Sequence, residues 1–286
     1  GRVWLDPPTA YTPVANATVT APAGTLREVR VTRAASGPGL TISGPVPHDT
    51  LVYTERVAVR DNTLYFATVL TETLRDAGIR VDGAPLDHDT RALRQAPALS
   101  ADTLFVHASP PLREVLAAFL KPSQNQYGEI LLKTLGRELR GTGSAAAGIA
   151  VVDSLARAWG LPPRRLAMAD GSGLSRYNLV SPDFLAALLA HMARSPRFEA
   201  FHAALPVAGQ DGTLAARMRG TPLAGNVHAK TGTLSGVRSL SGYLTTAAGE
   251  RVLFSAMVNH HTLTSRDADR LAEAALLRVY RLARER

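Results

Sequence analysis

The strongest constraint on the fold is the change of hydrophobic period in the last third of the chain. Residues 227–234, 239–246 and 251–259 alternate as three consecutive strands, and the turn at 247–250 makes the last two a hairpin. A closing helix is predicted over 266–284. Helical periodicity dominates much of the chain before these strands. Helices followed by an antiparallel meander and a last helix predict an α+β domain, in which an antiparallel sheet is covered by helices.

The first fifty residues differ from the rest in composition and in hydrophobic periodicity. Residues 1–50 hold many Pro, Gly, Thr and Val residues and show no helical period, and within them 17–20 and 29–32 alternate like half-buried strands. The stretch is too short to bury a convincing core by itself. We therefore interpret 1–50 as the end of a small β-rich domain and 51–286 as a second domain, which begins with a strand predicted over 51–59.

The predicted helices of the second domain have recognisable ends. Asp61 caps a helix that Gly78 closes. Ser109 and Pro110 place a cap and a first-turn proline at the start of the next helix. Pro122 ends that helix, because the residue before a proline is pushed out of the helical region. Further helices are predicted over 126–139, 145–159 and 181–193, and residues 170–178 have the composition of a loop.

The first candidate for chemistry is the segment Lys230, Thr231, Gly232 and Thr233 at the head of a predicted strand. Lys230 brings a fixed positive charge suited to a carboxylate. Gly232 lets a substrate backbone lie against the strand, and Thr233 can offer a main-chain N–H as half of an oxyanion hole. Because side chains alternate along a strand, a local twist or the strand edge must bring Thr231 to the same ligand. A strand lysine before a Thr-Gly turn is the alternative interpretation.

The second candidate is Ser123, Gln124 and Asn125, in the predicted loop between two helices. Such a loop can turn a hydroxyl and an amide towards one cleft. Ser123 could then pass a proton to a leaving amine, and Asn125 could hold a substrate carbonyl or a lysine. The alternative interpretation is a helix N-cap, a role that both residue types favour.

Together with the segments around them, the two motifs resemble the class C low-molecular-mass penicillin-binding proteins, which are D-alanyl-D-alanine carboxypeptidases and endopeptidases. The resemblance implies a β-lactamase/transpeptidase-like domain. Residues 1–50 would be the C-terminal remnant of a β-rich inserted domain, and 51–286 the second half of the catalytic domain. Gln124 stands where Asp is commonest in the family, and we expect little effect from it. The segments that carry the resemblance are 121–125, 129–132, 170–176, 205–209, 211–214, 228–233 and 240–243.

One motif of this family does not occur in the sequence. The nucleophile lies in Ser-x-x-Lys, and none of the three lysines, Lys121, Lys133 and Lys230, has a serine three positions before it. The resemblance implies that the nucleophile belongs upstream of Gly1. The chain by itself is then expected to be inactive.

The family mechanism assigns roles to the residues of the two motifs. A serine would attack a peptidoglycan stem peptide ending in D-Ala-D-Ala, or a β-lactam antibiotic, and water would release the acyl group. The resemblance implies that Ser123, Asn125 and Lys230 are catalytic. It implies that Thr231, Gly232 and Thr233 bind the substrate. Neither a cofactor nor a metal is expected, and the protein is predicted to be exported to the periplasm or cell envelope.

Composition argues against several other functions. The net charge is +8, but no block of like charges and no basic stretch interleaved with aromatic residues supports binding to nucleic acid. No apolar run is long enough to be a transmembrane segment. The chain has no cysteine, and His260 and His261 lack the carboxylate-flanked spacing of a zinc site.

Two other functions stay open at this point. The missing nucleophile would also fit a non-catalytic module that binds peptidoglycan or a partner protein, and the fold would also fit an esterase or a D-amino-acid amidase. Four further residues invite a catalytic interpretation but are predicted to be structural: Asp170, Arg176 and Asp211 in holding loops, and His228 in strand packing.

Overall fold

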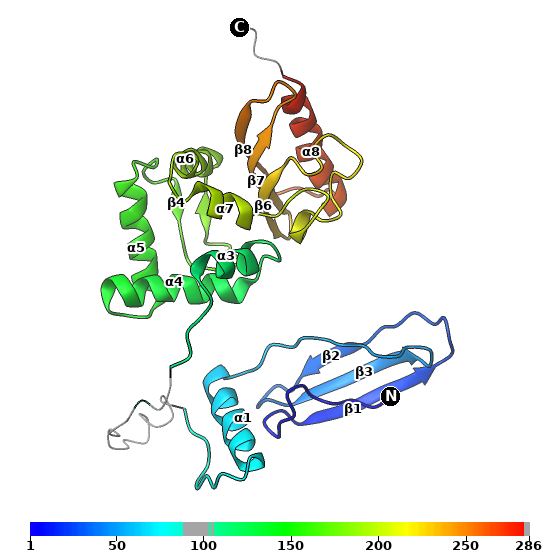
Figure 1. The fold of residues 1–286 in the computed structure, drawn as a ribbon. Coiled ribbons are helices and arrows are strands. Elements are labelled where there is room, and N and C mark those ends of the chain that lie inside the picture. Colours follow the sequence, from blue (N-terminus) through cyan, green and yellow to red (C-terminus); the bar gives the residue numbers. More distant parts are fainter. Residues whose placement is uncertain (88–102, 104–105, 283–286) are drawn as a thin grey trace. The chain divides into compact units, whose positions relative to one another are not determined.

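The computed structural model of the chain describes residues 1–87, 103 and 106–282 (Figure 1). The chain divides into two compact units, Gly1–Phe105 and Val106–Arg286. The predicted domain boundary after residue 50 concerns the inserted domain of the family, and it stays a prediction.

The first unit contains a small mixed sheet. β1 (Val14–Ala21) pairs in parallel with β3 (Leu40–Pro47), and β2 (Arg30–Arg33) pairs antiparallel with the other edge of β3. The two strands predicted in the first fifty residues are thereby confirmed as β1 and β2. The strand predicted over 51–59 is wrong, because this run has no pairing strand and leaves its first apolar side chain, Leu51, 98% exposed. Alternation produces a strand only where a neighbour takes up its hydrogen bonds and one face is buried.

Helix α1 (Asn62–Asp76) also belongs to the first unit. The side chain of Asp61 accepts a hydrogen bond from Leu64 N–H at 2.9 Å, which confirms the predicted cap. Tyr11 ties the helix to the N-terminal segment, since its ring meets that of Tyr65 edge-on with the centroids 5.4 Å apart. Glu72 adds a second tie by accepting the N–H of Ala10 at 3.0 Å.

The second unit begins with helices, named in Figure 1. Most of them follow the predicted ranges, but α3 begins two residues later than predicted, with Pro111 and not Ser109 at its N-cap. The sequence explains this difference, because Pro110 precedes Pro111 and is itself pushed out of the helical region. The helices are α3 (Leu112–Leu120), α4 (Asn125–Arg140), α5 (Ala145–Ala158), α6 (Pro182–Ala193) and α7 (Phe198–Ala204), of which α7 was not predicted. The short pair β4 (Leu166–Ala167) and β5 (Leu179–Val180) was not predicted either.

The predicted meander forms the sheet of the second unit. β6 (His228–Leu234), β7 (Val237–Thr245) and β8 (Arg251–Asn259) are antiparallel in this order, and α8 (Ser265–Arg281) follows them. All four elements confirm the sequence prediction. Residues 283 and 284, at the end of the predicted last helix, lie outside the described residues.

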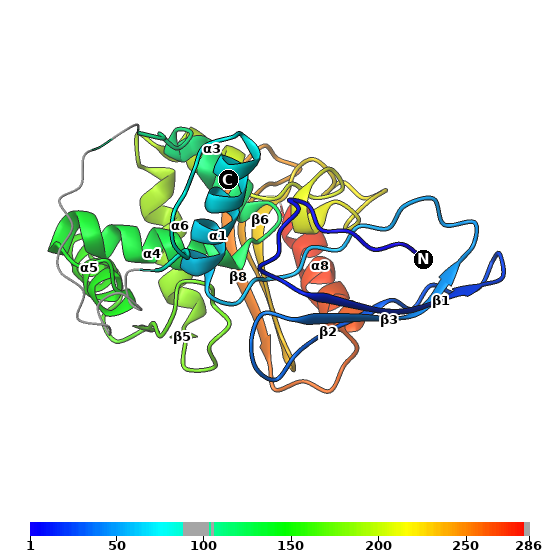
Figure 2. The same ribbon diagram turned by 90° about the horizontal axis from the view of Figure 1, so that it is seen from below.

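Both faces of this sheet are covered by helices. On one face, Leu240 and Leu244 pack with Leu276 of α8 in a fully buried cluster. On the other face, Tyr243 packs with Phe198 of α7 and with residues of α6. Figures 1 and 2 show α8 along one side of β6–β8, and Figure 1 shows α6 and α7 on the other side. This arrangement confirms the α+β prediction of an antiparallel sheet between helices.

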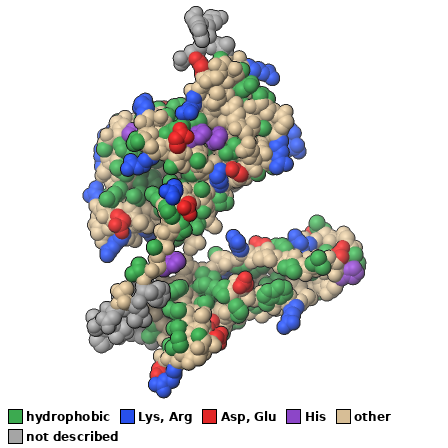
Figure 3. All heavy atoms as spheres, in the orientation of Figure 1, with side chains coloured by type: hydrophobic (Ala, Val, Ile, Leu, Met, Phe, Trp, Pro, Cys, Tyr) green, Lys and Arg blue, Asp and Glu red, His purple; other side chains and the backbone are tan. Residues whose placement is uncertain are grey.

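Figure 3 shows the charged side chains on one face of the molecule. On the face drawn in Figure 3, Lys and Arg side chains are scattered among other residues and form no continuous stripe. Within the described part of the chain, no helix is long and apolar enough to cross a membrane.

Candidate active site

The two sequence motifs meet at one hydrogen bond. Lys230 lies on β6, and its Nζ donates to Ser123 Oγ at 2.7 Å. The same Nζ donates to the carbonyl oxygen of Thr231 at 2.8 Å. A lysine and a serine 107 residues apart in the sequence are thus held in direct contact. Asn125, two residues after Ser123 in the sequence, is exposed and is the first residue of α4.

Ser123 occupies an unusual backbone conformation in the turn between α3 and α4. Its φ is 58°, in the left-handed region that non-glycine residues rarely adopt. Gln124, and not Ser123 or Asn125, is the N-cap of α4, and it makes no side-chain capping bond. The alternative role of the motif as a helix N-cap is therefore wrong. A backbone of this kind costs about 1–3 kcal/mol and is typical of functional turns.

Burial changes the acidity of Lys230. Removal of its ammonium group from water lowers the pKa to about 8. Near neutral pH such a lysine is still mostly protonated, but it releases its proton far more readily than an exposed lysine. With the Ser123 hydroxyl at hydrogen-bond distance, the pair can pass a proton between the two side chains.

The free edge of β6 exposes main-chain donors. Ala229 N–H donates to the carbonyl of Pro206 at 3.0 Å, so Ala229 turns its N–H away from β7. Because this direction repeats every second residue in an antiparallel strand, Thr231 and Thr233 turn their N–H groups to the same edge. No strand of the described residues pairs with this edge beyond the isolated bridge at His228. Thr233 N–H is therefore available to a ligand.

The packing of β6 against β7 leaves no room for a side chain at Gly232. It pairs with Ser239 of β7, and a Cβ on Gly232 would lie 2.3 Å from Ser239 Oγ. Any larger residue would have to displace this hydroxyl. The close approach of a substrate to Gly232 stays a prediction.

Thr231 is not on the same side of the strand as Lys230. Its hydroxyl donates to Thr213 Oγ1 at 2.9 Å, in the short 3-10 helix η1 (Gly212–Leu214). The contact confirms that strict alternation divides the Lys-Thr-Gly motif between two faces.

A second lysine supports the turn that carries Ser123. Lys121 Nζ donates to Asp211 Oδ2 at 2.6 Å and to the carbonyl of Leu205 at 3.1 Å. Asp211 also accepts the N–H of Val207 at 2.9 Å. Burial raises the pKa of Asp211, but the hydrogen bonds from Lys121 and Val207 and the charges of Lys121 and His228 together outweigh this effect and leave the pKa below its usual value. Asp211 thus holds a loop, as predicted. The contact of Lys121 with Asp211 could not be predicted from the sequence, because no local pattern reveals an ion pair between residues 90 positions apart.

The glycine-rich loop at 170–178 is held by carboxylates. Glu129 of α4 accepts the N–H groups of Gly171 and Ser172 at 3.1 and 2.9 Å. Asp170 accepts the N–H of Ser175 at 2.7 Å and also bonds two further groups of its own loop. Burial raises the pKa of Asp170, but these hydrogen bonds outweigh it and the net pKa is lowered. The structural role predicted for Asp170 is confirmed.

His228 has an aromatic neighbour. Its ring stacks on that of His202 with the centroids 4.0 Å apart. Burial lowers the pKa of both imidazoles and so favours their neutral forms. The predicted packing role of His228 is confirmed. Arg176 donates to the carbonyl of Ser235 at 3.4 Å, so it ties the loop to the β6–β7 turn.

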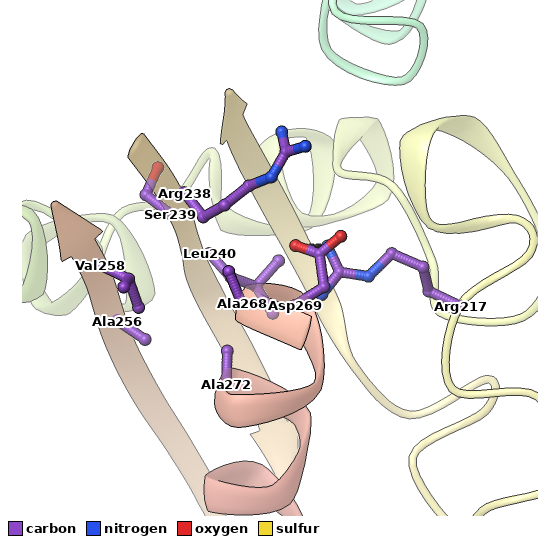
Figure 4. A pocket seen from close by; sticks show the side chains of 9 residues that line it. All are labelled: Arg217, Arg238, Ser239, Leu240, Ala256, Val258, Ala268, Asp269 and Ala272. Atoms are coloured by element: carbon purple, nitrogen blue, oxygen red, sulfur yellow. Dashed lines mark ion pairs between the residues drawn. The ribbon is translucent and has the colours of Figure 1, made fainter. Parts of the chain in front are cut away.

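Two cavities lie elsewhere in the described residues. A cavity of about 10 Å³ between the sheet and α8 includes Arg217 and Asp269, which point towards each other in Figure 4 and pair at 3.2 Å. This volume holds one water molecule at most. A groove of about 560 Å³ in the first unit is lined by residues between Val3 and Val14, none of which was predicted to be functional. Among the described residues, no group of His, Cys, Asp or Glu is arranged to hold a metal ion.

Known proteins are similar to this chain in sequence and in fold. Residues 2–279 match the D-Ala-D-Ala carboxypeptidase 3 (S13) family. The chain is 36% identical over 259 residues to a D-alanyl-D-alanine carboxypeptidase of Actinomadura sp. (strain R39), covering 88% of this chain and 47% of that protein. It is 34% identical over 208 residues to the D-alanyl-D-alanine carboxypeptidase DacB of Haemophilus influenzae, covering 72% of this chain and 42% of that protein. The chain thus spans less than half the length of these two relatives.

A solved structure matches almost the whole chain. The crystal structure of penicillin binding protein 4 (dacB) from Haemophilus influenzae, complexed with a β-lactam, superposes with a TM-score of 0.75 at 26% sequence identity. The match covers 96% of this chain and 65% of that one. The α+β fold is therefore that of a penicillin-binding protein 4 over most of the chain.

Proposed function

Because the chain belongs to the D-Ala-D-Ala carboxypeptidase 3 (S13) family, we propose that it forms part of the active site of a serine-type D-Ala-D-Ala carboxypeptidase or endopeptidase. The substrate is a peptidoglycan stem peptide ending in D-Ala-D-Ala, and β-lactams acylate the same serine. The observation that carries the proposal is the hydrogen bond of 2.7 Å between Lys230 Nζ and Ser123 Oγ. It unites the two motifs in the geometry that proton transfer requires.

The reaction divides into two acyl transfers. The nucleophilic serine attacks the carbonyl carbon of the penultimate D-Ala, and the C–N bond to the last D-Ala breaks. Ser123 passes a proton to the departing amine and takes one from Lys230, and the proton that the attacking serine loses replaces the one taken from Lys230. Asn125 orients the substrate, and Thr233 N–H stabilises the oxyanion from the free edge of β6. Water then cleaves the acyl-serine ester and releases the shortened peptide.

The nucleophile comes from a Ser-x-x-Lys segment outside these 286 residues. The sequence contains no such motif, and the chain spans less than half of its relatives. The chain alone is accordingly inactive, and the complete site needs the strands and helix that carry the serine. The reaction uses no metal or cofactor, and its substrate places the protein in the cell envelope.

The test is covalent labelling of the full gene product with a fluorescent penicillin. We expect a label that survives denaturation and is reduced about 100-fold or more in rate by Lys230→Met, since loss of one group that stabilises the transition state costs this much. Lys133→Met is the matched control, because Lys133 is exposed on α4. A folded, unlabelled gene product would refute the proposal.

A non-catalytic module is the second candidate, and the missing Ser-x-x-Lys favours it. Such a module would bind D-Ala-D-Ala peptides without acylation by penicillin. Reading the coding DNA upstream of Gly1 separates the two candidates, because the enzyme requires an in-frame Ser-x-x-Lys and the module does not.

A further inference from the structure

The hydroxyl groups of Thr213 and Thr231 form a pair at the edge of the site. Thr231 Oγ1 donates to Thr213 Oγ1 at 2.9 Å. We propose that Thr213, as the hydrogen-bond partner of Thr231, is a further specificity-determining residue for the terminal carboxylate of the substrate. The inference rests on the proposed function and adds a residue that the Lys-Thr-Gly motif does not contain.

The number of protons in the pair supports this role. Two hydroxyls carry two O–H donors, and one of them is used between the two oxygens. One O–H therefore stays available, whichever threonine donates to the other. A hydroxyl that already takes part in a hydrogen bond is polarised and becomes a better donor to an anion. A carboxylate, which only accepts hydrogen bonds, is the matching ligand.

The position of Thr231 explains why it needs a partner. Lys230 pairs with Ser241 across the sheet, whereas Thr231 pairs with Leu240. Leu240 belongs to the buried cluster beneath α8, so Thr231 lies on the opposite face from Lys230. In the described part of the chain, the hydroxyl of Thr231 has one hydrogen-bond partner, which is Thr213. Without Thr213, nothing on that face would fix the direction of the Thr231 O–H.

The pair is accessible and yet firmly placed. Thr213 is exposed, so an incoming carboxylate can reach it. The next residue, Leu214, is completely buried in the cluster under the sheet. A side chain anchored on one side and open on the other suits a ligand contact, because little conformational freedom is lost when the ligand binds.

Lys121 connects the pair to Ser123. Its carbonyl accepts the N–H of Thr213 at 3.0 Å, and it stands two residues before Ser123. Gly212 lies against this carbonyl so closely that a Cβ would be 2.5 Å from the oxygen. A closed circuit thus runs from Ser123 through Lys230, Thr231, Thr213 and Lys121 back to Ser123. The circuit fixes the distance between the proton-transfer pair and the hydroxyl pair.

The charges around the circuit favour an anion near Lys230. Lys121 is paired with Asp211 at 2.6 Å, and the two charges compensate each other. Lys230 has no carboxylate among its hydrogen-bond partners in the described residues. Its positive charge can therefore attract a substrate carboxylate.

The test compares two peptides ending in D-Ala-D-Ala, one with a free carboxylate and one with a C-terminal amide. Equilibrium binding of both is measured on the full gene product, with the serine of any Ser-x-x-Lys replaced by alanine. We expect the native Thr213 protein to prefer the carboxylate and Thr213→Val to lower this preference about 10-fold, the loss expected for one hydrogen bond to a charged group. Thr213→Ser should restore the preference because it keeps the hydroxyl.

Thr134→Val is the matched control, because the Thr134 hydroxyl bonds only within α4, to Ile130. It should leave the preference unchanged. If Thr213→Val keeps the full preference, or weakens both peptides equally, Thr213 is not a specificity residue, while the proposed function stands. If the protein with native Thr213 shows no preference for the carboxylate, the proposed function fails, and this inference fails with it.

Discussion

β6 and the turn at 121–124 contribute two parts of the candidate site, and they are positioned in different ways. β6 is one strand of a regular ladder, in which every residue from His228 to Leu234 has a partner on β7. The turn has no ladder. Its geometry depends on a few separate contacts, such as Gln124 N–H with the carbonyl of Phe119 at 3.0 Å and the bonds of Lys121.

The burial of the two regions differs as well. Ala229 of β6 and Leu240, the partner of Thr231 on β7, have exposed fractions of 0% and 1%. Ser123 is partly exposed, and Gln124 and Asn125 are exposed. Hydrophobic burial therefore stabilises the strand side, whereas hydrogen bonds and a strained backbone shape the turn side. Substitutions on the two sides should consequently differ in the size of their effect on stability.

The largest effect should come from the core beneath β6. Leu240→Ala removes a completely packed side chain and should destabilise the fold by about 2–5 kcal/mol, from lost burial and the remaining cavity. Urea denaturation of the gene product measures the change. Leu139→Ala, at an exposed position of α4, is the control. A loss below about 1 kcal/mol would show that the ladder does not depend on this cluster.

A smaller effect of opposite sign is expected at Lys230. Its pKa is about 8 in the folded chain against 10.5 for a free lysine, so folding disfavours the charged form. At pH 7, Lys230→Met should therefore stabilise the fold by about 1–3 kcal/mol, although it removes one member of the proposed proton-transfer pair. Between pH 8 and 10.5 the unfolded chain binds more protons than the folded chain, so native stability rises with pH.

The stabilisation by Lys230→Met should accordingly shrink as the pH rises through this window and vanish above it. Denaturation at several pH values tests this, with Lys133→Met as the exposed control. A pH-independent gain would mean that packing and not desolvation explains the change.

The smallest effect is expected in the turn. Ser123→Gly and Ser123→Ala both remove the hydroxyl, but glycine adopts the left-handed φ of 58° without strain. The glycine variant should be the more stable by about 1 kcal/mol, and both should lose activity equally. Thermal melts of the two variants provide the measurement. Equal melting temperatures would show that the turn is not strained in solution.

Regular elements were predictable from the sequence, and irregular segments were less so. The three strands of the meander and the helices from α4 to α6 carry periodic patterns that a local rule can detect. The same rule wrongly predicted a strand over 51–59, because a strand also needs a neighbouring strand to pair with. The start of α3 was misjudged at a double proline, where the second proline decided the boundary.

The candidate site could be predicted in its motifs but not in its connections. Ser123 and Lys230 stood out by residue type and spacing alone. Lys121, Thr213 and Glu129 did not, although each of them holds a segment of the site in place. Their partners lie tens of residues away, and a hydrogen bond across such a separation leaves no local pattern in the sequence.

The sequence by itself determined the order of the elements, the faces of the strands and the two motifs, because these follow from periods of a few residues. Only the tertiary structure decided that Lys230 would contact Ser123 and that Thr231 would instead bond Thr213. It also decided the lowered pKa of Lys230, since burial of an ammonium group depends on what packs around it. Local patterns fix which groups a strand or helix presents, whereas the packing of separate elements fixes which of those groups meet.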